Sequence, residues 1–141
     1  MSAACLGCSI ANSWQECQVV YEDDYVTCVL DIAPLNEGHT LILPKRHYAE
    51  LVEMDPAVLE AVMEASVHVS KALSAVYKPD GISVIQNGGQ FNDLGHYHMH
   101  VFPRYQGDGF GWKEPEQAAN PEQPGLVKDK LQQVIQALLN P

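Results

Sequence analysis

Three histidines alternate with apolar residues in one short segment, where residues 96–102 read His-Tyr-His-Met-His-Val-Phe. Successive side chains of a β-strand point to opposite faces. This spacing therefore predicts three imidazoles on one face and Tyr97, Met99 and Val101 on the other. A single histidine on a strand is usually structural, but core packing does not explain three of them above an apolar face. The segment predicts a functional site.

A row of imidazoles suits two kinds of chemistry. A His-x-His pair with one further ligand can hold a catalytic zinc ion that keeps an open coordination position. Alternatively, one neutral imidazole attacks phosphorus while its neighbours set its tautomer and protonate the leaving group. The reference pKa of histidine, about 6.5, leaves the ring mostly neutral and nucleophilic at neutral pH. The residues alone leave both chemistries open.

A second group of candidate residues is the Cys5-x-x-Cys8 motif, which contains two of the four cysteines. By itself the motif is compatible with a redox pair, with free thiols or with metal ligands. In a reducing compartment we expect metal ligation or free thiols rather than disulfides. Cys17 and Cys28 have no such partner, and we expect them to be buried as apolar side chains.

The elements that must position these residues follow from hydrophobic periodicity. Short apolar runs predict five strands, at Val19–Tyr21, Tyr25–Leu30, Thr40–Leu43, Ile82–Gln86 and His96–Arg104. A long helix begins at Pro56 with Asp55 as its N-cap and ends at Pro79-Asp80-Gly81. The stretch between Tyr105 and Gly125 is rich in glycine and proline and predicts a surface loop, followed by an amphipathic helix over Leu126–Leu139.

Strands on both sides of one long helix, with short connections, predict an α+β fold with a five-stranded antiparallel sheet. We expect a single domain over residues 1–141, with its core at about 4–105 and a C-terminal loop and helix at 106–141. The sequence contains neither the Gly-x-Gly-x-x-Gly fingerprint nor a P-loop, which disfavours dinucleotide-binding folds. We expect no organic cofactor.

Composition restricts the partners. The chain has 18 acidic and 8 basic residues and a formal net charge of −10. Nucleic-acid binding needs a basic face, so we expect no nucleic-acid partner, and local donors must hold any anionic substrate. The sequence starts without the basic and apolar regions of a secretion signal, and no apolar run is long enough to span a bilayer. We therefore expect a cytoplasmic protein with no membrane partner.

The sequence resembles the histidine-triad (HIT) superfamily, whose signature is His-x-His-x-His followed by two apolar residues, with apolar residues at x. The resemblance runs from Cys5 to Arg104 and includes the segments Leu30–Ile32, Gly38–His47 and Phe102–Tyr105 in the order of the family. It is strongest to the bacterial-type Hint branch. The resemblance implies a HIT-like fold and a homodimer in which the sheets of two subunits join.

The resemblance also implies catalytic roles. The central histidine of the triad, His98, is the nucleophile. His100 lies near the leaving group and orients it, and His39 completes the site from the adjacent strand. Asp31 binds the ribose hydroxyls, because two carboxylate oxygens suit a vicinal diol.

The implied phosphate-binding donors are the amides of Gln86, Asn87 and Asn92. Here the sequence departs from the family, which usually has Gly-Gln-Ser/Thr-x-x-His before the triad, whereas this chain has Asp93 at the Ser/Thr position. A carboxylate would repel a phosphate if it faced it. Gly7 is a second departure, since a bulky apolar residue often lines the base pocket at that position.

Some members of the branch bind zinc through two such cysteines and two such histidines. The resemblance therefore implies a structural zinc ion held by Cys5, Cys8, His47 and His96. A tetrahedron of four protein ligands is closed, so it would join the N-terminal segment to the sheet and fix the start of the triad strand.

Together these expectations describe a hydrolase or transferase that cleaves a P–N or P–O–P bond at the α-phosphate of a purine nucleotide, through a nucleotidyl-histidine intermediate. Substrate candidates are a nucleoside phosphoramidate and a dinucleoside polyphosphate. Two alternatives remain: a nucleotide-binding or scaffold protein with little turnover, and a metalloenzyme with zinc on the triad. The complete triad with His39 disfavours the scaffold, because binding needs no nucleophile.

Overall fold

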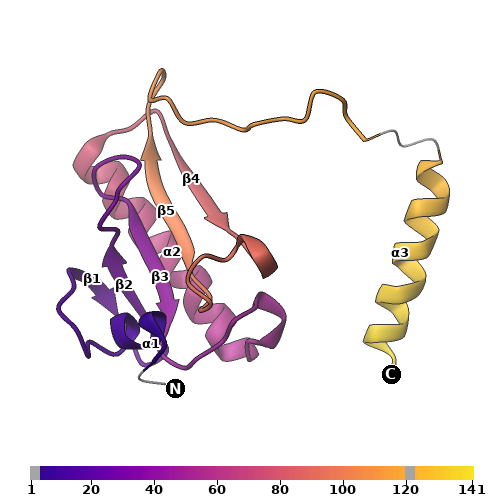
Figure 1. Ribbon diagram of the computed structural model, residues 1–141, viewed down its shortest axis with the longest axis horizontal. Coiled ribbons are helices and arrows are strands. Elements are labelled where there is room, and N and C mark those ends of the chain that lie inside the picture. The colour runs from indigo at the N-terminus through magenta and orange to yellow at the C-terminus, as the bar shows by residue number, and fades with distance from the viewer. Residues whose placement is uncertain (1–3, 120–122) are drawn as a thin grey trace. The chain divides into compact units, whose positions relative to one another are not determined.

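The computed structural model describes residues 4–119 and 123–141, in two compact units, residues 1–110 and 111–141. The first unit contains a five-stranded antiparallel sheet with strand order β1-β2-β3-β5-β4 (Figure 1). The strands are β1 Val19–Glu22, β2 Val26–Leu30, β3 Thr40–Pro44, β4 Gly81–Gln86 and β5 Met99–Arg104. The predicted α+β fold with a five-stranded sheet is confirmed.

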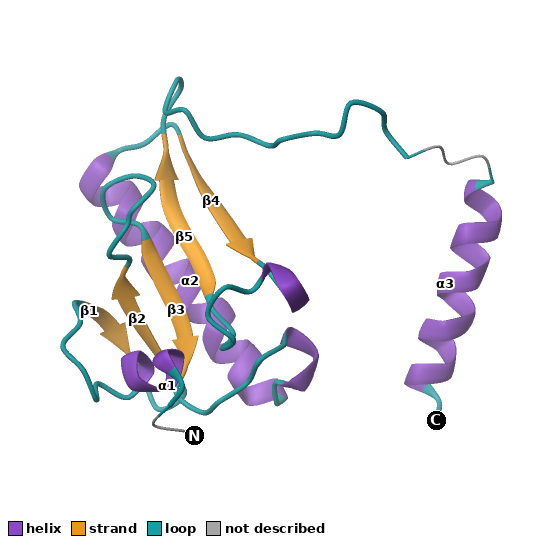
Figure 2. Cartoon of the chain, in the orientation of Figure 1, coloured by secondary structure: helices purple, strands orange, loops and turns teal. Residues whose placement is uncertain are grey.

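Helices and short helical turns precede, connect and follow these strands (Figure 2). They are α1 Leu6–Ala11, the 3₁₀ turns Leu51–Glu53 and Gly89–Phe91, the long helix α2 Pro56–Tyr77, and α3 Pro124–Leu139. Helix α2 crosses behind the sheet in Figure 1 and packs against β2, β3, β4 and β5. Helix α1 contacts β2 and β3.

The core lies between α2 and one face of the sheet. Alternate residues of β2, β3 and β5 are buried against the helix: Val26, Cys28, Ile42, Met99 and Val101. Burial raises the pKa of the Cys28 thiol to about 12, as expected for a cysteine that packs as an apolar side chain. Cys17 is only half-buried, because it lies in the connection between α1 and β1. The opposite face of the sheet is left for the histidines.

The strand that carries the triad is shorter than predicted. Ladder pairing of β5 begins at Met99, so His96 and His98 precede the strand. The backbone N–H of Tyr97 donates instead to the carbonyl of Tyr48 at 2.7 Å. The Tyr97 side chain still packs in the core with Met99 and Val101, so the predicted alternation is confirmed although regular pairing starts later.

The long helix begins at Pro56 as predicted, and it ends at Tyr77 because Lys78 adopts the left-handed conformation with φ 47°. Asp55 occupies the N-cap position, but its carboxylate does not cap the helix. It accepts a hydrogen bond from the Tyr48 hydroxyl at 3.0 Å instead. The prediction of Asp55 as the N-cap residue is confirmed, although its side chain makes no capping hydrogen bond.

The second unit contains α3, which starts two residues earlier than predicted. The helix has an amphipathic sequence, and none of its residues is buried. Among the described residues, no helix is both long enough and apolar enough to cross a membrane.

Candidate active site

His98 lies immediately before β5 and is almost fully buried, with 4% of its surface exposed. Its Nδ1 atom lies 2.9 Å from the carbonyl oxygen of His96. A carbonyl only accepts hydrogen bonds, so Nδ1 carries the proton and Nε2 carries the lone pair of the neutral ring. The backbone thus leaves the lone pair of the neutral His98 ring on Nε2.

A second hydrogen-bond chain sets the tautomers of His39 and His100. The backbone N–H of Leu35 donates to Nδ1 of His39 at 3.1 Å, so the His39 proton is on Nε2. That Nε2 lies 2.9 Å from Nδ1 of His100, which therefore accepts. His100 in turn carries its proton on Nε2, and its ring packs edge-on against His98 with centroids 4.9 Å apart.

Both supporting rings are neutral near pH 7. Burial is the main cause that lowers the pKa of His100 to about 4, and the adjacent His98 and His39 rings act in the same direction. Burial also lowers the pKa of His39. Asp31 opposes this effect with a carboxylate oxygen 3.6 Å from Nε2 of His39. His100 therefore offers a hydrogen-bond donor rather than a positive charge.

Asp31 lies at the end of β2 and is half-buried beside these rings. One carboxylate oxygen accepts the N–H of Ala33 at 2.8 Å and thereby stabilises the following turn. The other faces His39. Asp31 thus caps a turn and also lines the site.

The three predicted amide donors, Gln86, Asn87 and Asn92, have different hydrogen-bond partners, and they do not all line the same cavity. Asn87 lines the same cavity as His100. The Gln86 amide donates to the neighbouring carbonyl of Asn87 at 2.7 Å, and Gln86 is not among the lining residues. Asn92 donates to the carbonyl of Ala49 and accepts two backbone N–H groups at 3.1 Å. Asn92 therefore shapes the loop before the triad and does not reach the cavity.

The site opens into a cavity of about 450 Å³. Its walls are formed by Asp31, Ala33, Leu35, His39, Ile85, Asn87, Asp93, His100, Phe102 and Phe110. A carboxylate oxygen of Asp93 lies 3.4 Å from Nε2 of His98. Asp93 therefore faces the position that a phosphate would take. Among the described residues, no lysine or arginine lines this cavity.

Cys5, Cys8, His47 and His96 form a separate cluster, in which one potential ligand atom of each lies within 4.8 Å of the others. Nδ1 of His96 is 3.6 Å from each cysteine sulfur, and Nδ1 of His47 is 3.5 Å from that of Cys8. Zinc bond lengths and tetrahedral angles require N···S separations of about 3.6 Å. The four residues therefore fit a closed zinc site.

The orientation of His96 supports this fit. Its Nε2 lies 2.8 Å from the carbonyl oxygen of Pro44, so Nε2 is protonated and Nδ1 points its lone pair at the sulfurs. Helix α1 packs directly on this ring. A Cβ atom added to Gly7 would lie 2.3 Å from Cβ of His96, so only glycine permits this approach. Gly7 thus has a packing role beside the cluster.

Zinc on the triad itself fits less well, although Asp31, His39 and His100 also lie close together. The 2.9 Å separation between the nitrogens of His39 and His100 is that of a hydrogen bond. Two nitrogens bound to one tetrahedral zinc would be about 3.3 Å apart. The geometry favours a proton between these rings.

Two contributors to the site were not predicted. The Leu35 contribution is a backbone N–H, for which no side-chain pattern exists. Phe110 belongs to a segment that was predicted to be a surface loop, but residues 105–110 form part of the first unit and Phe110 lines the cavity. The only available signal was Asp108 between two glycines, a sequence typical of a tight turn.

Comparison with known proteins identifies the family to which this chain belongs. Residues 12–107 match the HIT domain family. An uncharacterized HIT-like protein of Borreliella burgdorferi is 40% identical over 77% of this chain and 81% of its own. The adenylylsulfatase HINT3 of Arabidopsis thaliana is 35% identical over 74% of this chain and 54% of its own.

Solved structures are similar over almost the whole chain. A histidine triad nucleotide-binding protein from Candida albicans is 25% identical with a TM-score of 0.83, covering 96% of this chain and 99% of its own. A zinc-bound histidine triad family protein from Mycobacterium smegmatis is 28% identical with a TM-score of 0.71, covering 95% and 97%. The similarity thus includes one protein that holds zinc.

Proposed function

We propose, given that this chain belongs to the HIT domain family and has a nucleotide-binding hydrolase fold, that it hydrolyses a purine nucleoside phosphoramidate at the α-phosphate. The observation that carries the proposal is the orientation of His98, whose protonated Nδ1 is held by the backbone so that Nε2 presents a lone pair to the site. The relative named adenylylsulfatase supports an adenylyl group as the part that is transferred.

The reaction proceeds in two steps. The lone pair of His98 Nε2 forms a bond to phosphorus, and the leaving group departs with its bonding electrons and takes up a proton. Water then attacks phosphorus, the N–P bond breaks toward the imidazole, and a nucleoside monophosphate and a proton are released. Nε2–H of His100 donates to the reacting group, and Asp31 holds the ribose hydroxyls.

The charge of the cavity favours an amine over a polyphosphate as leaving group. Asp31 and Asp93 place two carboxylates in a lining that contains no lysine or arginine among the described residues. A polyphosphate would bring further negative charge against them, whereas an amine is neutral or positive and can donate to Asp93. A dinucleoside polyphosphate is therefore the weaker candidate.

Cys5, Cys8, His47 and His96 would hold a structural zinc ion. Bound there, zinc supplies no chemistry to the substrate and links α1 to the segment that leads into the triad. His96 would supply a ligand atom to this site with its side chain, and its backbone carbonyl orients His98.

Replacement of the nucleophile tests the proposal. We expect His98→Ala to lower kcat by at least about 10⁴-fold, because covalent catalysis loses its attacking atom. Nucleotide affinity measured by calorimetry should remain within a few-fold, because His98 does not carry ribose binding. His68→Ala, which removes an exposed histidine from α2, is the matched control and should keep full activity.

Rapid quench of the wild type with an α-labelled substrate should trap protein-bound label that is stable to base and lost in acid, as a P–N bond requires. Comparable turnover by His98→Ala would refute the mechanism. Nucleotide binding without turnover in the wild type would identify the chain as a binding or scaffold protein instead.

A further inference from the structure

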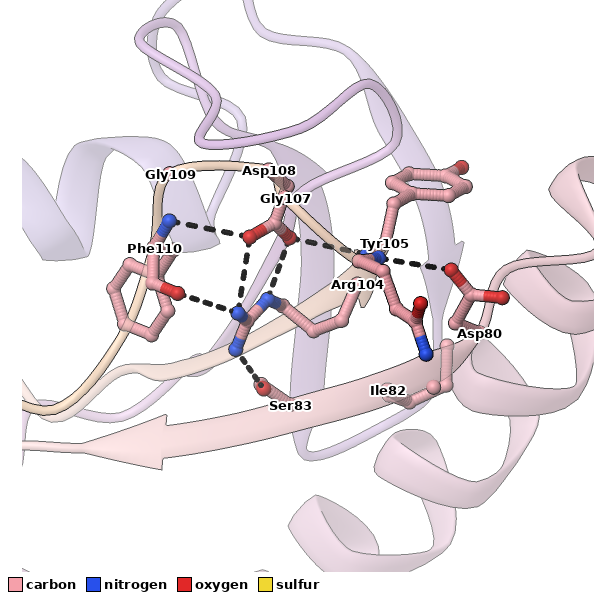
Figure 3. Close-up of a pocket in the computed structure, with 11 residues that line it drawn as sticks. Asp80, Ile82, Ser83, Arg104, Tyr105, Gly107, Asp108, Gly109 and Phe110 are labelled. Carbon is pink, nitrogen blue, oxygen red and sulfur yellow. Dashed lines mark hydrogen bonds and ion pairs between the residues drawn. The ribbon is translucent and has the colours of Figure 1, made fainter.

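The hollow between β4, β5 and the loop 105–110 fixes the point where the chain leaves the first unit (Figure 3). The Arg104 guanidinium donates to both carboxylate oxygens of Asp108, at 2.7 and 3.0 Å, and to the carbonyl of Phe110 at 2.7 Å. A backbone N–H of the same loop donates to Asp80, just beyond the end of α2, at 2.9 Å. These bonds direct the guanidinium at protein acceptors, so the hollow holds the loop in place and is not an anion site.

A different hollow runs along α2 on the side of β1, which forms one edge of the sheet (Figure 1). Six exposed residues of α2 form one bank, at intervals of three or four positions: Ala57, Glu60, Glu64, His68, Ala72 and Val76. The other bank is formed by β1, β2 and the turn between them: Val20, Tyr21, Asp23, Asp24, Tyr25 and Leu30. We call this surface the α2–β1 groove. None of the candidate active-site residues lines it.

One half of the α2–β1 groove is acidic and has a volume of about 320 Å³. Its carboxylates come from both banks: Asp23, Asp24, Glu60 and Glu64. Asp23 accepts the backbone N–H groups of Tyr25 and Val26 at 2.8 Å. In the described part of the chain, the other three carboxylates form no ion pair. This half therefore presents negative charge that no basic side chain neutralises among the described residues.

The other half of the groove is apolar and has a volume of about 380 Å³. It adjoins the acidic half where the rings of Tyr21 and His68 lie 5.4 Å apart. Most of its lining is aliphatic or aromatic, yet Val20, Leu30 and Val76 remain exposed there. Contiguous exposed apolar surface beside charged residues is typical of an interaction site.

Helix α3 has the pattern that complements this groove. Its apolar residues recur at helical spacing on one face, and all of them are exposed: Val127, Leu131, Val134, Ile135 and Leu138. With about 3.6 residues per turn, Lys128 and Lys130 fall on the two borders of this face, in the first half of the helix. Lys128 lies 3.4 Å from the exposed Asp129, a surface pair that stabilises little. The helix is thus basic near its start and apolar beyond.

The groove and the helix also match in length. From Ala57 to Val76 the groove follows α2 for about 28 Å, and the 16 residues of α3 extend for about 24 Å. With Lys128 and Lys130 beside the acidic half, the apolar residues of 131–138 extend over the apolar half. Ion pairing at one end and apolar burial at the other are what an amphipathic helix needs in order to bind a groove.

The α3 helix of the same chain reaches this position poorly. Phe110 packs on Phe102, on the face of the sheet opposite α2. From there residues 111–124 would have to cover about 30 Å along α2 and about 14 Å across the strands from β5 to β1, besides turning around the sheet. Their full extension is about 46 Å. Docking within one chain would thus demand complete extension, whereas docking on a second copy does not.

We infer that the α2–β1 groove binds α3 of a second copy of this chain, with Lys128 and Lys130 on the acidic half and the apolar face of α3 on the apolar half. The inference does not depend on the proposed hydrolase activity. In a symmetric dimer each copy supplies one groove and one helix, so the contact forms twice. A dimer that is also joined through its sheets keeps the two copies at high local concentration and strengthens this docking.

Cross-linking between isotopically light and heavy chains tests the partner. The full-length chains are mixed until native mass spectrometry shows both labels in one dimer, and a carbodiimide then joins adjacent lysines and carboxylates. We expect links from Lys128 or Lys130 to Glu60 or Glu64, as often between the two labels as within one. Links only within one label would place α3 on its own chain and overturn the inference. Absence of these links, or of mixed dimers, would overturn it as well.

Hydrogen exchange of the α3 amides gives a second readout. A free helix of 16 residues is marginal in water, so its amides exchange fast unless it is docked. We expect Glu60→Lys/Glu64→Lys to speed exchange in α3 about tenfold, because lysines would then face lysines. Adding Lys128→Glu/Lys130→Glu reverses both charges and should restore the protection, as coupled sites require.

Matched controls separate this docking from general effects of charge. Glu16→Lys/Glu37→Lys makes the same charge change at exposed positions outside the groove and should leave exchange in α3 unchanged. Val76→Glu, in the apolar half, should speed exchange, whereas Val52→Glu, at a 91% exposed position outside the groove, should not. Wild-type α3 amides that exchange like those of an unstructured peptide, or that respond equally to groove and control variants, overturn the inference.

Discussion

At the scale of single residues, the site depends on which ring nitrogen of each histidine carries the proton. Two backbone groups decide this, the carbonyl of His96 for His98 and the N–H of Leu35 for His39 and His100. Backbone groups cannot change between donor and acceptor, so they impose the tautomers. The proposed nucleophile, His98, is thereby oriented before substrate arrives, which would lower the cost of reaching the transition state.

Asp93 should control the charge of acceptable leaving groups. We expect Asp93→Ser to raise kcat/KM for a diadenosine polyphosphate by about tenfold relative to a phosphoramidate, because a carboxylate 3.4 Å from the attacking nitrogen is removed. The ratio of the two kcat/KM values measures the effect. Asp24→Ser, at an exposed position of the β1–β2 turn, removes the same charge and should leave the ratio unchanged. An unchanged ratio in Asp93→Ser would show that Asp93 does not act on the leaving group.

Burial of neutral His100 should make stability depend on pH. Its pKa is about 4 in the folded protein and about 6.5 in the unfolded chain. Between these values the unfolded chain binds more protons, so the free energy of unfolding falls as pH falls from about 6.5 to about 4. We expect His100 to account for a loss of about 2–3 kcal/mol between pH 7 and pH 4.5.

Urea unfolding of wild type and His100→Gln at several pH values measures this contribution. Glutamine cannot protonate, so the variant should lose less stability in acid. The plots of unfolding free energy against pH for the two proteins should therefore converge at low pH. Other titrating groups affect both proteins alike. Curves that remain parallel from pH 7 to pH 4.5 would contradict a depressed pKa for His100.

At the scale of elements, the candidate metal cluster joins α1 to the segment that enters β5. His96 supplies a ligand atom on its side chain and, through its carbonyl, the acceptor that orients His98. Loss of the metal should therefore loosen α1 first and reach the nucleophile only through this short segment. We therefore expect loss of the metal to lower the thermal stability of the protein more than its catalytic rate.

We expect about one zinc ion per chain after purification, and little in Cys5→Ser/Cys8→Ser. Gly7→Ala should also lower the zinc content and the melting temperature, because the added Cβ would lie 2.4 Å from Cγ of His96 and force α1 or the ring to move. Elemental analysis and thermal unfolding measure both effects. Gly81→Ala is the control, since a Cβ there meets nothing within 4 Å. Full zinc content in the double cysteine variant would refute the site.

At the scale of the whole molecule, charge and sheet edges are the relevant features. The net charge of −10 leaves capture of a nucleotide to local donors. The sheet ends in β1, a short strand with an irregular register, and in β4, a six-residue strand with regular pairing to β5. A regular exposed edge is the natural place for the sheets of two subunits to join.

We expect a homodimer that forms through β4. Light scattering should give about twice the chain mass of 15.5 kDa at micromolar concentration. Val84 is 49% exposed at the middle of β4, and Val84→Glu should shift the mass toward that of the monomer because two carboxylates would be brought together. Val20→Glu, at a similarly exposed valine of β1, should remain dimeric. A monomeric wild type would contradict the expectation.

The sequence by itself determined the periodic features. Alternation in the strands and helical spacing over residues 56–77 report local geometry, so the sheet, α2 and the shared face of Tyr97, Met99 and Val101 followed directly. The resemblance to the histidine-triad family named the residues that meet in the site, and the structure does bring His39, His98, His100 and Asp31 together.

Only the tertiary structure decided how these residues are held. The tautomers depend on backbone groups, which have no signature in side-chain order. Asn92 bonds its own loop, Asp93 faces Nε2 of His98, and Phe110 reaches the cavity because Asp108 binds Arg104. Each of these outcomes depends on where a side chain points once segments distant in sequence have packed together, and local periodicity does not contain that direction.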